Sequence, residues 1–260
     1  MGGFMKTIFA GLCVGLTLVL VACGGSASQI LPPSLTSSPS MAGIYEGTLT
    51  TAQENGTETS LLIEEDNSFS LVTDSGLQLL GTLTRLNDLQ YQGTAVLSHA
   101  EDASLPMLSV SLSMTVNANR SISASFSGSA LGSFTVLPSV EPSTASAPVS
   151  LSLLAGPYAA VPRSISTRLA TQWTLSNTGS LTGSDAVSSY TGTATQPRAD
   201  KNPFVLVFTR QLNGPSIPSA SFEGRLWYLP AKGTRPARLV MASRRITEGP
   251  RGIAGIFAKQ

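Results

Sequence analysis

The stretch LSVSLSMTV at residues 108–116, followed by NANRS at 117–121 and ISASFSG at 122–128, decides the fold of this chain. Along both outer segments apolar residues alternate with Ser or Thr, which is the period-2 pattern of a strand that buries one face. The asparagines between them are typical turn residues. The stretch therefore predicts an antiparallel hairpin with one apolar face and one hydroxyl face.

The same alternation recurs at residues 69–71, 204–208 and 225–229, and no window after residue 23 sustains a helical stripe. Charged residues make up only 12% of the chain, about half the usual share, and Ser, Thr and Gly take the polar positions instead. The sequence predicts an all-β protein, built as two tandem small antiparallel barrels or sandwiches of about 100 residues each.

The two halves resemble a diverged repeat. Four blocks in the first half have counterparts, in the same order, in the second half. They are Gly43-Ile44-Tyr45 with Gly156-Pro157-Tyr158, Phe69-Ser70-Leu71 with Trp173-Thr174-Leu175, residues 91–95 (YQGTA) with 190–194 (YTGTA), and residues 124–128 (ASFSG) with 220–224 (ASFEG). The aromatic residues beside glycine suit strands that cross closely at a barrel corner.

Two segments rich in Gly, Ser, Pro and Thr divide the chain and predict a tether and an interdomain linker. The expected boundaries are a signal peptide at 1–22, a flexible tether at 23–40, a first β domain at 41–137, a linker at 138–150 and a second β domain at 151–260.

The net charge of +1 conceals a strong asymmetry between the halves. Gly24–Pro142 carries eleven acidic and two basic residues, a net charge of −9, whereas Ser143–Gln260 carries thirteen basic and four acidic residues, a net charge of +9. Opposite charges of this size favour docking of the two domains on each other; the alternative is that the linker holds the domains apart and leaves the basic face free for an anionic partner.

The run Leu20-Val21-Ala22-Cys23 closes an apolar N-terminal segment that begins after Lys6. It resembles the lipobox of a bacterial lipoprotein with a type II signal peptide. The resemblance implies cleavage before Cys23, a cleaved signal and a lipid (palmitate-type) anchor on the Cys23 thiol. A simple cleaved signal or an N-terminal membrane anchor is the alternative.

The same resemblance implies a place in the bacterial cell envelope. Gly24 after the cysteine, rather than Asp, favours the outer membrane in a Gram-negative host. Cys13 would be removed with the signal, so the mature chain would have no disulfide and would depend on burial and strand pairing alone.

The residues offer little catalytic chemistry, so we expect no enzyme, no cofactor and no metal site. His99 is the one histidine, and we expect it in a solvent-exposed loop. The nucleophile-elbow pattern G-x-S-x-G does not occur. The acidic run at residues 64–67 (EEDN) lacks the ligand spacing of a calcium loop and predicts a solvated turn.

The strongest remaining surface signal is a basic run in the last quarter, made of Arg235, Arg238, Arg244 and Arg245. We interpret it as a candidate face for an anionic partner, namely an envelope protein, a glycan or a phosphorylated lipid headgroup. Nucleic acid is not expected outside the cytoplasm. Two other interpretations remain: the arginines keep edge strands soluble, or they face the acidic first domain.

Three functions follow from these observations. The leading one is a membrane-anchored envelope lipoprotein that acts as a non-catalytic binding or assembly module. The second is a carrier that holds a small apolar ligand inside a β-barrel, and the third is a hydrolase that uses a Ser–Lys or carboxylate pair. The plan is faintly similar to two-lobed barrel surface lipoproteins that capture host proteins, and Gly255-Ile256-Phe257 resembles their closing strand. No binding residue carries over.

Overall fold

The computed structural model describes residues 40–99, 106–139, 149–160, 172–199, 201–214, 219–247 and 252–260. The expected signal peptide, the lipobox cysteine Cys23 and the tether up to residue 39 lie outside the described residues, as does most of the expected linker, residues 140–148.

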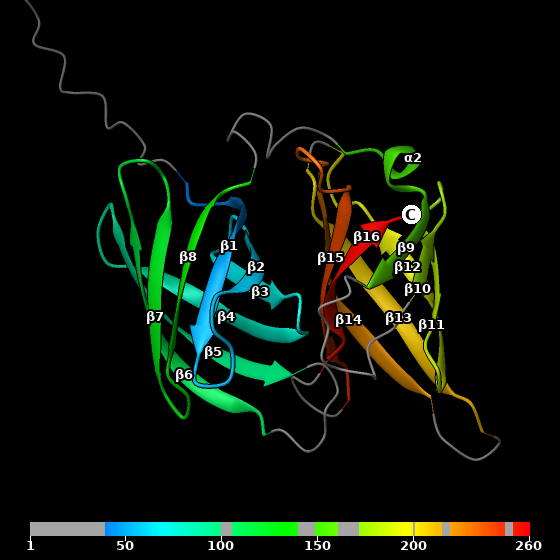
Figure 1. The fold of residues 1–260 in the computed structure, drawn as a ribbon, viewed down its shortest axis with the longest axis horizontal. Coiled ribbons are helices and arrows are strands. Elements are labelled where there is room, and N and C mark those ends of the chain that lie inside the picture. Colours follow the sequence, from blue (N-terminus) through cyan, green and yellow to red (C-terminus); the bar gives the residue numbers. More distant parts are fainter. Residues whose placement is uncertain are drawn as a thin grey trace, which may run out of the picture. The chain divides into compact units, whose positions relative to one another are not determined.

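The first half of the chain forms a closed barrel of eight antiparallel strands in which each strand pairs with its neighbours in sequence (Figure 1). The first strand also pairs with the eighth, with Gly47 opposite Val136, and this pairing closes the barrel. The strands are β1 (Gly43–Thr51), β2 (Thr57–Ile63), β3 (Ser68–Thr73), β4 (Leu77–Arg85), β5 (Gln90–His99), β6 (Leu108–Val116), β7 (Ile122–Gly128) and β8 (Gly132–Pro138).

The second half forms another closed barrel of eight antiparallel strands. Its first strand pairs with both the second and the last, with Tyr158 opposite Trp173 on one side and Lys259 on the other. A one-turn helix, α2 (Leu151–Leu154), precedes it. The strands are β9 (Gly156–Ala160), β10 (Gln172–Leu175), β11 (Ser180–Ser184), β12 (Ser188–Thr195), β13 (Phe204–Leu212), β14 (Ala220–Leu229), β15 (Arg238–Arg245) and β16 (Ala254–Lys259).

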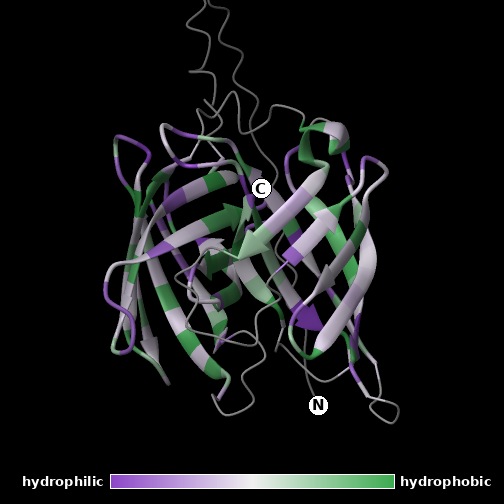
Figure 2. Cartoon of the chain, turned by 45° about the vertical axis from the view of Figure 1, so that its right-hand side comes forward, coloured by the Kyte–Doolittle hydropathy of each residue, from purple (hydrophilic) through white to green (hydrophobic). Residues whose placement is uncertain are grey.

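The hairpin predicted at residues 108–128 is β6 and β7. Leu112 lies opposite Phe126 and Met114 opposite Ala124, and all four side chains are buried in the first barrel while the intervening serines face outward. The same alternation of apolar and polar residues runs along strands of both barrels (Figure 2). The all-β fold of two tandem barrels is confirmed.

Glycine allows neighbouring strands to approach closely at matching places in the two barrels. A Cβ atom at Gly93 in β5 would lie 2.2 Å from the carbonyl oxygen of Thr82, and a Cβ atom at Gly192 in β12 would lie 2.3 Å from that of Val207. Real Cβ atoms do not come so near, so these positions exclude any larger residue. Each glycine belongs to the Y-x-G-T-A block of the predicted repeat.

The repeat blocks fall on strands with a nearly constant offset. Three pairs of blocks lie on β3 and β10, β5 and β12, and β7 and β14, which are each seven strands apart. The first pair lies on β1 and β9, eight strands apart. In the first barrel one strand, β2, lies between the first two blocks, whereas in the second barrel the first two blocks lie on consecutive strands. The second barrel instead has two strands after its last block, β15 and β16, where the first barrel has only β8.

The first pair of blocks shares a hydrogen bond as well as a sequence. The hydroxyl of Tyr45 donates to the carbonyl of Met41 at 2.8 Å, and that of Tyr158 donates to the carbonyl of Leu154 at 2.6 Å, each four residues upstream. Burial raises the pKa of Tyr158 to about 12. In both barrels a buried tyrosine therefore ties the chain that enters the barrel to its first strand.

Aromatic side chains fill the interior of the second barrel. Trp173 lies 4.9 Å from Tyr190 and 5.6 Å from Phe208 between ring centroids, and Phe208 stacks on Phe222 at 4.9 Å. Offset and edge-on ring pairs of this kind add to the stabilisation from burial alone. Leucines, smaller aliphatic residues and a few aromatics, Phe126 among them, fill the first barrel.

Phe126 and Phe222, which the sequence predicts as core anchors, are both buried in their barrels. We expect Phe126→Ala and Phe222→Ala each to lower the free energy of unfolding by about 3–5 kcal/mol, because each deletes a ring from a packed core. Urea denaturation followed by circular dichroism measures the loss. Ser125→Ala, on the outward face of the same strand as Phe126, is the control and should change stability little. Unchanged unfolding of the phenylalanine variants would contradict the assignment.

Candidate functional site

The outer faces of the two barrels meet in an apolar seam, within the single compact unit to which the described residues belong. The first barrel contributes residues of its first four strands and the second barrel contributes residues of β14, β15 and β16. The buried members are Ile44, Leu62, Val72, Trp227, Leu229, Val240, Ala242, Ala254 and Ile256, with Leu80 packed against them. Because both faces of β15 are covered, its residues are buried without alternation over most of its length.

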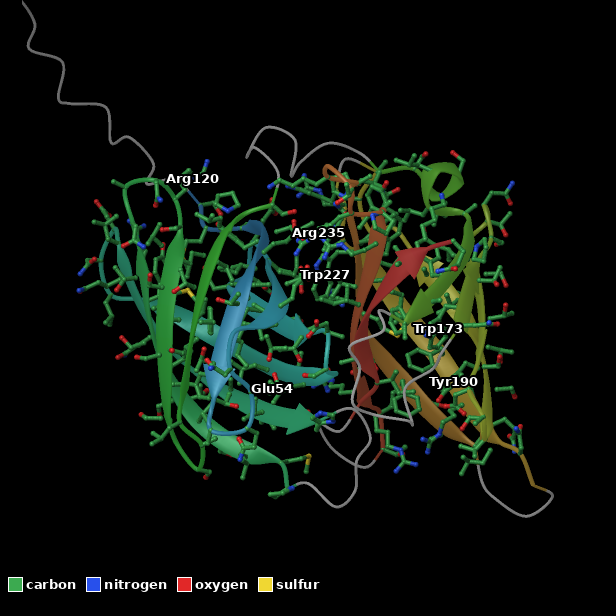
Figure 3. All side chains as sticks on the ribbon, in the orientation of Figure 1. Glu54, Arg120, Trp173, Tyr190, Trp227 and Arg235 are labelled. Carbon is green, nitrogen blue, oxygen red and sulfur yellow. The ribbon has the colours of Figure 1, made fainter. Side chains whose placement is uncertain are left out.

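Trp227 is the largest side chain in the seam and is fully buried (Figure 3). Its indole nitrogen donates to Ser60 Oγ in β2 at 2.9 Å. Nearby, Gln78 Nε2 in β4 donates to the carbonyl oxygen of Ser243 in β15 at 3.0 Å. These polar groups are buried, and a buried donor without an acceptor is costly, so the two bonds favour one relative placement of the barrels.

Ion pairs surround the apolar part of the seam and match the charge asymmetry of the sequence. Arg238 is only 6% exposed in its side chain and pairs with both Glu46 and Glu58 of the first barrel. Arg235 lies 3.1 Å from the same Glu58. On another side of the seam, Arg225 Nε donates to both oxygens of Glu64 at 2.8 and 2.9 Å. The basic barrel and the acidic barrel are therefore in direct contact.

The four arginines of the candidate anionic-partner face do not lie together. Arg235 and Arg238 precede and begin β15, where they pair across the seam, whereas Arg244 and Arg245 end the same strand. Arg244 is exposed and its guanidinium donates to Glu223 of its own barrel at 2.6 and 2.9 Å. Of the three interpretations of this basic run, the structure favours pairing with the acidic first domain for Arg235 and Arg238. Binding of an anionic partner stays a prediction.

The acidic turn at residues 64–67 joins β2 to β3 and takes part in the contact between the barrels. The sequence predicted only a solvated turn here. Glu64 pairs with Arg225, and Glu65 pairs with Lys201 at 2.7 Å and with Arg198 at 3.2 Å. The signal in the sequence was the opposite charge of the two halves, which indicates contact but not which residues meet.

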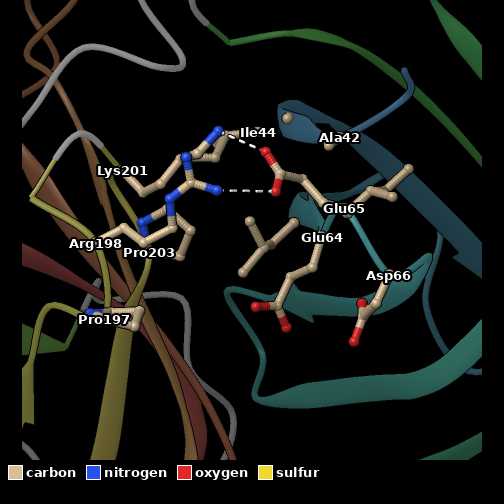
Figure 4. A pocket seen from close by; sticks show the side chains of 12 residues that line it. Ala42, Ile44, Glu64, Glu65, Asp66, Pro197, Arg198, Lys201 and Pro203 are labelled. Carbon is tan, nitrogen blue, oxygen red and sulfur yellow. Dashed lines mark hydrogen bonds and ion pairs between the residues drawn. The ribbon is translucent and has the colours of Figure 1, made fainter.

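A groove that we call the end groove lies beside this turn (Figure 4). Its volume is about 260 Å³, and it lies between the start of β1, the turn after β2 and the segment between β12 and β13. Ile44, Leu62, Pro197 and Pro203 supply apolar lining, and Glu65, Arg198 and Lys201 supply charge. Asp66 also lines it; hydrogen bonds from the Ser68 side chain and backbone lower the pKa of this carboxyl group.

A second hollow, the side groove, follows another flank of the seam. It has a volume of about 510 Å³ where β3 and β4 face β13, β14 and β15. It continues over the outer face of β4, β5 and β6 as a hollow of about 530 Å³, which shares Leu80, Gly81, Thr82 and Val96 with it. Val205 and Val207 form its wall on the second barrel, and the ion pairs Glu64–Arg225 and Glu223–Arg244 lie along it.

His99 does not lie in an exposed loop, contrary to expectation. It is the last residue of β5, half-buried, and pairs with Leu77 of β4. Strand pairing of β4 and β5 extends to this end of the hairpin and holds the residue in the barrel wall. Within the described part of the chain, no three His, Cys, Asp or Glu side chains gather as a metal ion would require.

The described residues contain no helix with the length and apolar character needed to span a membrane.

Comparison of the chain with protein-family models, with curated proteins and with solved structures finds no match.

We expect Glu58→Gln to lower the free energy of unfolding by roughly 1.5–3 kcal/mol, because it removes a charged acceptor from the buried Arg238 guanidinium. Glu65→Gln is the matched control: its pairs with Lys201 and Arg198 are more exposed, so the cost should stay below about 1 kcal/mol. Urea denaturation measures both variants. Equal losses would show that the Arg238 pair is no more important than a surface contact.

Proposed function

We propose that this chain is a bacterial envelope lipoprotein, anchored through lipid on Cys23 and placed in the outer membrane, whose two barrels act together as a non-catalytic binding or assembly module. Its expected partner is another envelope component, and the side groove is the surface that we assign to it. The observation that carries the proposal is the apolar seam, which joins the two barrels into one body. The end groove and the side groove lie beside this contact, and the side groove continues over the outer face of the first barrel.

The packing of the barrel interiors supports a binding module over a carrier of a small apolar ligand. A carrier needs a cavity of several hundred Å³ inside a barrel. In the second barrel, Trp173, Tyr190, Phe208, Phe222 and Phe257 are each at most 2% exposed and contact one another. The apolar residues that would line such a cavity pack on each other instead.

The contacts of Lys201 and Lys259, two of the three lysines after Cys23, speak against a Ser–Lys hydrolase that uses either of them. Lys201 Nζ donates to Glu65, and Lys259 Nζ donates to the carbonyl oxygen of Leu153. Neither amine is positioned beside a serine hydroxyl in these contacts, and a lysine that serves as general base must reach its serine directly.

The lining of the side groove suits a segment of a protein partner. Its floor combines apolar side chains, Leu80 and Val96, with the hydroxyls of Ser70 and Thr82 and the bare backbone at Gly81. Such a mixture offers apolar contact in the middle and hydrogen bonds along the edges, as in protein–protein interfaces. The two hollows share Leu80 in their lining, and together they are lined by residues of β3 to β6 on the first barrel.

Cys23→Ser tests the anchor. We expect the variant to accumulate as an unprocessed precursor without lipid label, because the lipobox offers one acceptor thiol. Intact mass of the mature N-terminus and membrane fractionation are the measurements. A mature N-terminus at another residue, without lipid, would contradict the anchor. Retention of the wild-type protein in the inner membrane would contradict the proposed location in the outer membrane.

Val207→Asp tests the side groove. Val207 is 46% exposed, so the substitution should leave the fold intact while it places a charge in the apolar wall of the groove. We expect the lipidated variant to lose most of the partner that the wild-type protein captures from native membranes. Val187→Asp, at an exposed turn outside the groove, is the matched control. Equal capture by both variants would show that the partner binds outside the side groove.

A further inference from the structure

We propose that one end of the two-barrel body, which we call the tether end, rests on an anionic membrane surface. The tether end is the end at which the chain enters β1. The inference rests on the proposed lipid anchor, because the anchor brings this end to the bilayer. It adds a second, electrostatic and apolar contact that would fix the orientation of the body.

The up-and-down order of the strands defines which turns lie at the tether end. β1 begins there, so in the first barrel the turns at residues 64–67, 86–89 and 117–121 share that end. The ion pairs of Glu65 with Lys201 and Arg198 place the segment between β12 and β13 beside them. Hydrogen bonding of the Lys259 backbone to Ala237 places the end of β16 next to the β14–β15 turn.

Apolar side chains project from the turn between β4 and β5 at this end. Leu86 is 56% exposed and Leu89 is 53% exposed. The turn that presents them is rigid: Asn87 Oδ1 accepts from the amides of Leu89 and Gln90 at 3.0 and 2.9 Å, and Leu86 N donates to the Gln90 carbonyl. Because these hydrogen bonds already order the turn, the leucines can enter the interfacial region of a bilayer with little further loss of conformational entropy.

Cations accompany the leucines. All three lysines that follow Cys23 in the sequence, Lys201, Lys232 and Lys259, lie at the tether end. Among the described residues Lys232, Lys259 and Arg120 have no acidic side chain as an ion-pair partner, and Lys232 is exposed in the β14–β15 turn. Figure 3 shows Arg120 and Arg235 toward one end of the barrels and Glu54 toward the other.

The carboxylates at the tether end do not cancel this charge. Glu64 pairs with Arg225, Asp88 pairs with Arg85, and Glu65 is shared by two cations. Asp66 is hydrogen-bonded by Ser68 and is the one acidic group here without a basic partner among the described ion pairs. Among the side chains that the structure describes at this end the uncompensated charge is positive, which matches the negative surface of a bilayer that contains anionic phospholipid.

The length of the tether fits this contact. Seventeen residues, 23–39, separate the lipid on Cys23 from the start of the described chain, and a segment of this length spans at most about 60 Å even when fully extended. A lipid at one end of so short a segment keeps the tether end at a high effective concentration near headgroups. Weak attractions of a few cations are then sufficient to hold the body against the surface, while the side groove on the flank stays accessible.

The native lysines allow the contact to be measured by amine acylation of the lipidated full-length protein, followed by mass spectrometry. The protein is reconstituted in vesicles of phosphatidylcholine alone and in vesicles that also contain phosphatidylglycerol. We expect Lys232 to react roughly threefold to tenfold more slowly on the anionic vesicles. Leu131→Lys introduces a reference amine at the turn between β7 and β8, at the opposite end, where Leu131 is 69% exposed; that amine should react equally on both.

The double substitution Leu86→Ser and Leu89→Ser should reduce the protection of Lys232 without changing the fold, because both leucines are exposed. Equal reactivity of Lys232 on the two kinds of vesicle would overturn the proposal, as would equal protection of the reference amine. Intact mass reports the lipid separately. An unlipidated chain whose Lys232 is still protected would contradict the anchor alone, and a lipidated chain whose Lys232 is unprotected would contradict the docking surface alone.

Discussion

The contact of Arg238 with Glu46 and Glu58 is the interaction on which the arrangement of the two barrels depends. A guanidinium that is 6% exposed is tolerated only when its charge is met, and both carboxylates belong to the other barrel. With Trp227 bonded to Ser60 beside it, the seam combines apolar burial with directional bonds. Apolar contact alone would accept many orientations; the buried polar groups favour one.

A two-barrel body with a sealed seam presents different surfaces from two barrels on a loose linker. Flanks of the contact become grooves because two convex walls meet there, and such hollows contain residues from both barrels. A partner that binds in the side groove would therefore contact both halves at once. Under the proposed function, two joined barrels provide a binding surface that one barrel lacks, since residues of both line the side groove.

The assignment of ends follows from the same geometry. Once the barrels are joined, the turns of each lie at two ends of one body, and the chain that leads to the proposed anchor enters at one of them. Exposed leucines in a rigid turn and lysines without acidic partners gather where that chain begins. In the proposed orientation, the flank that contains the side groove points along the membrane rather than into it.

Much of the fold could be predicted from the sequence because strand formation and burial depend on local alternation. Residues 108–128 predicted their hairpin, its inward residues and its turn, and the Y-x-G-T-A blocks predicted glycines at close strand crossings. The opposite charges of the two halves indicated attraction between them. Periodicity could not distinguish a barrel from a sandwich, because both bury one face of each strand, and it could not foresee that β15 is covered on both.

The sequence by itself determined the strands, the two halves and the sign of the charge on each, since these depend on residue type and spacing. Only the tertiary structure decided which charges meet. Arg235 and Arg238 read as a surface patch in the sequence, yet they pair with Glu46 and Glu58, about 180 residues away along the chain. The physical reason is that an ion pair or a groove depends on distances in space, and these are set by barrel closure and docking rather than by separation along the chain.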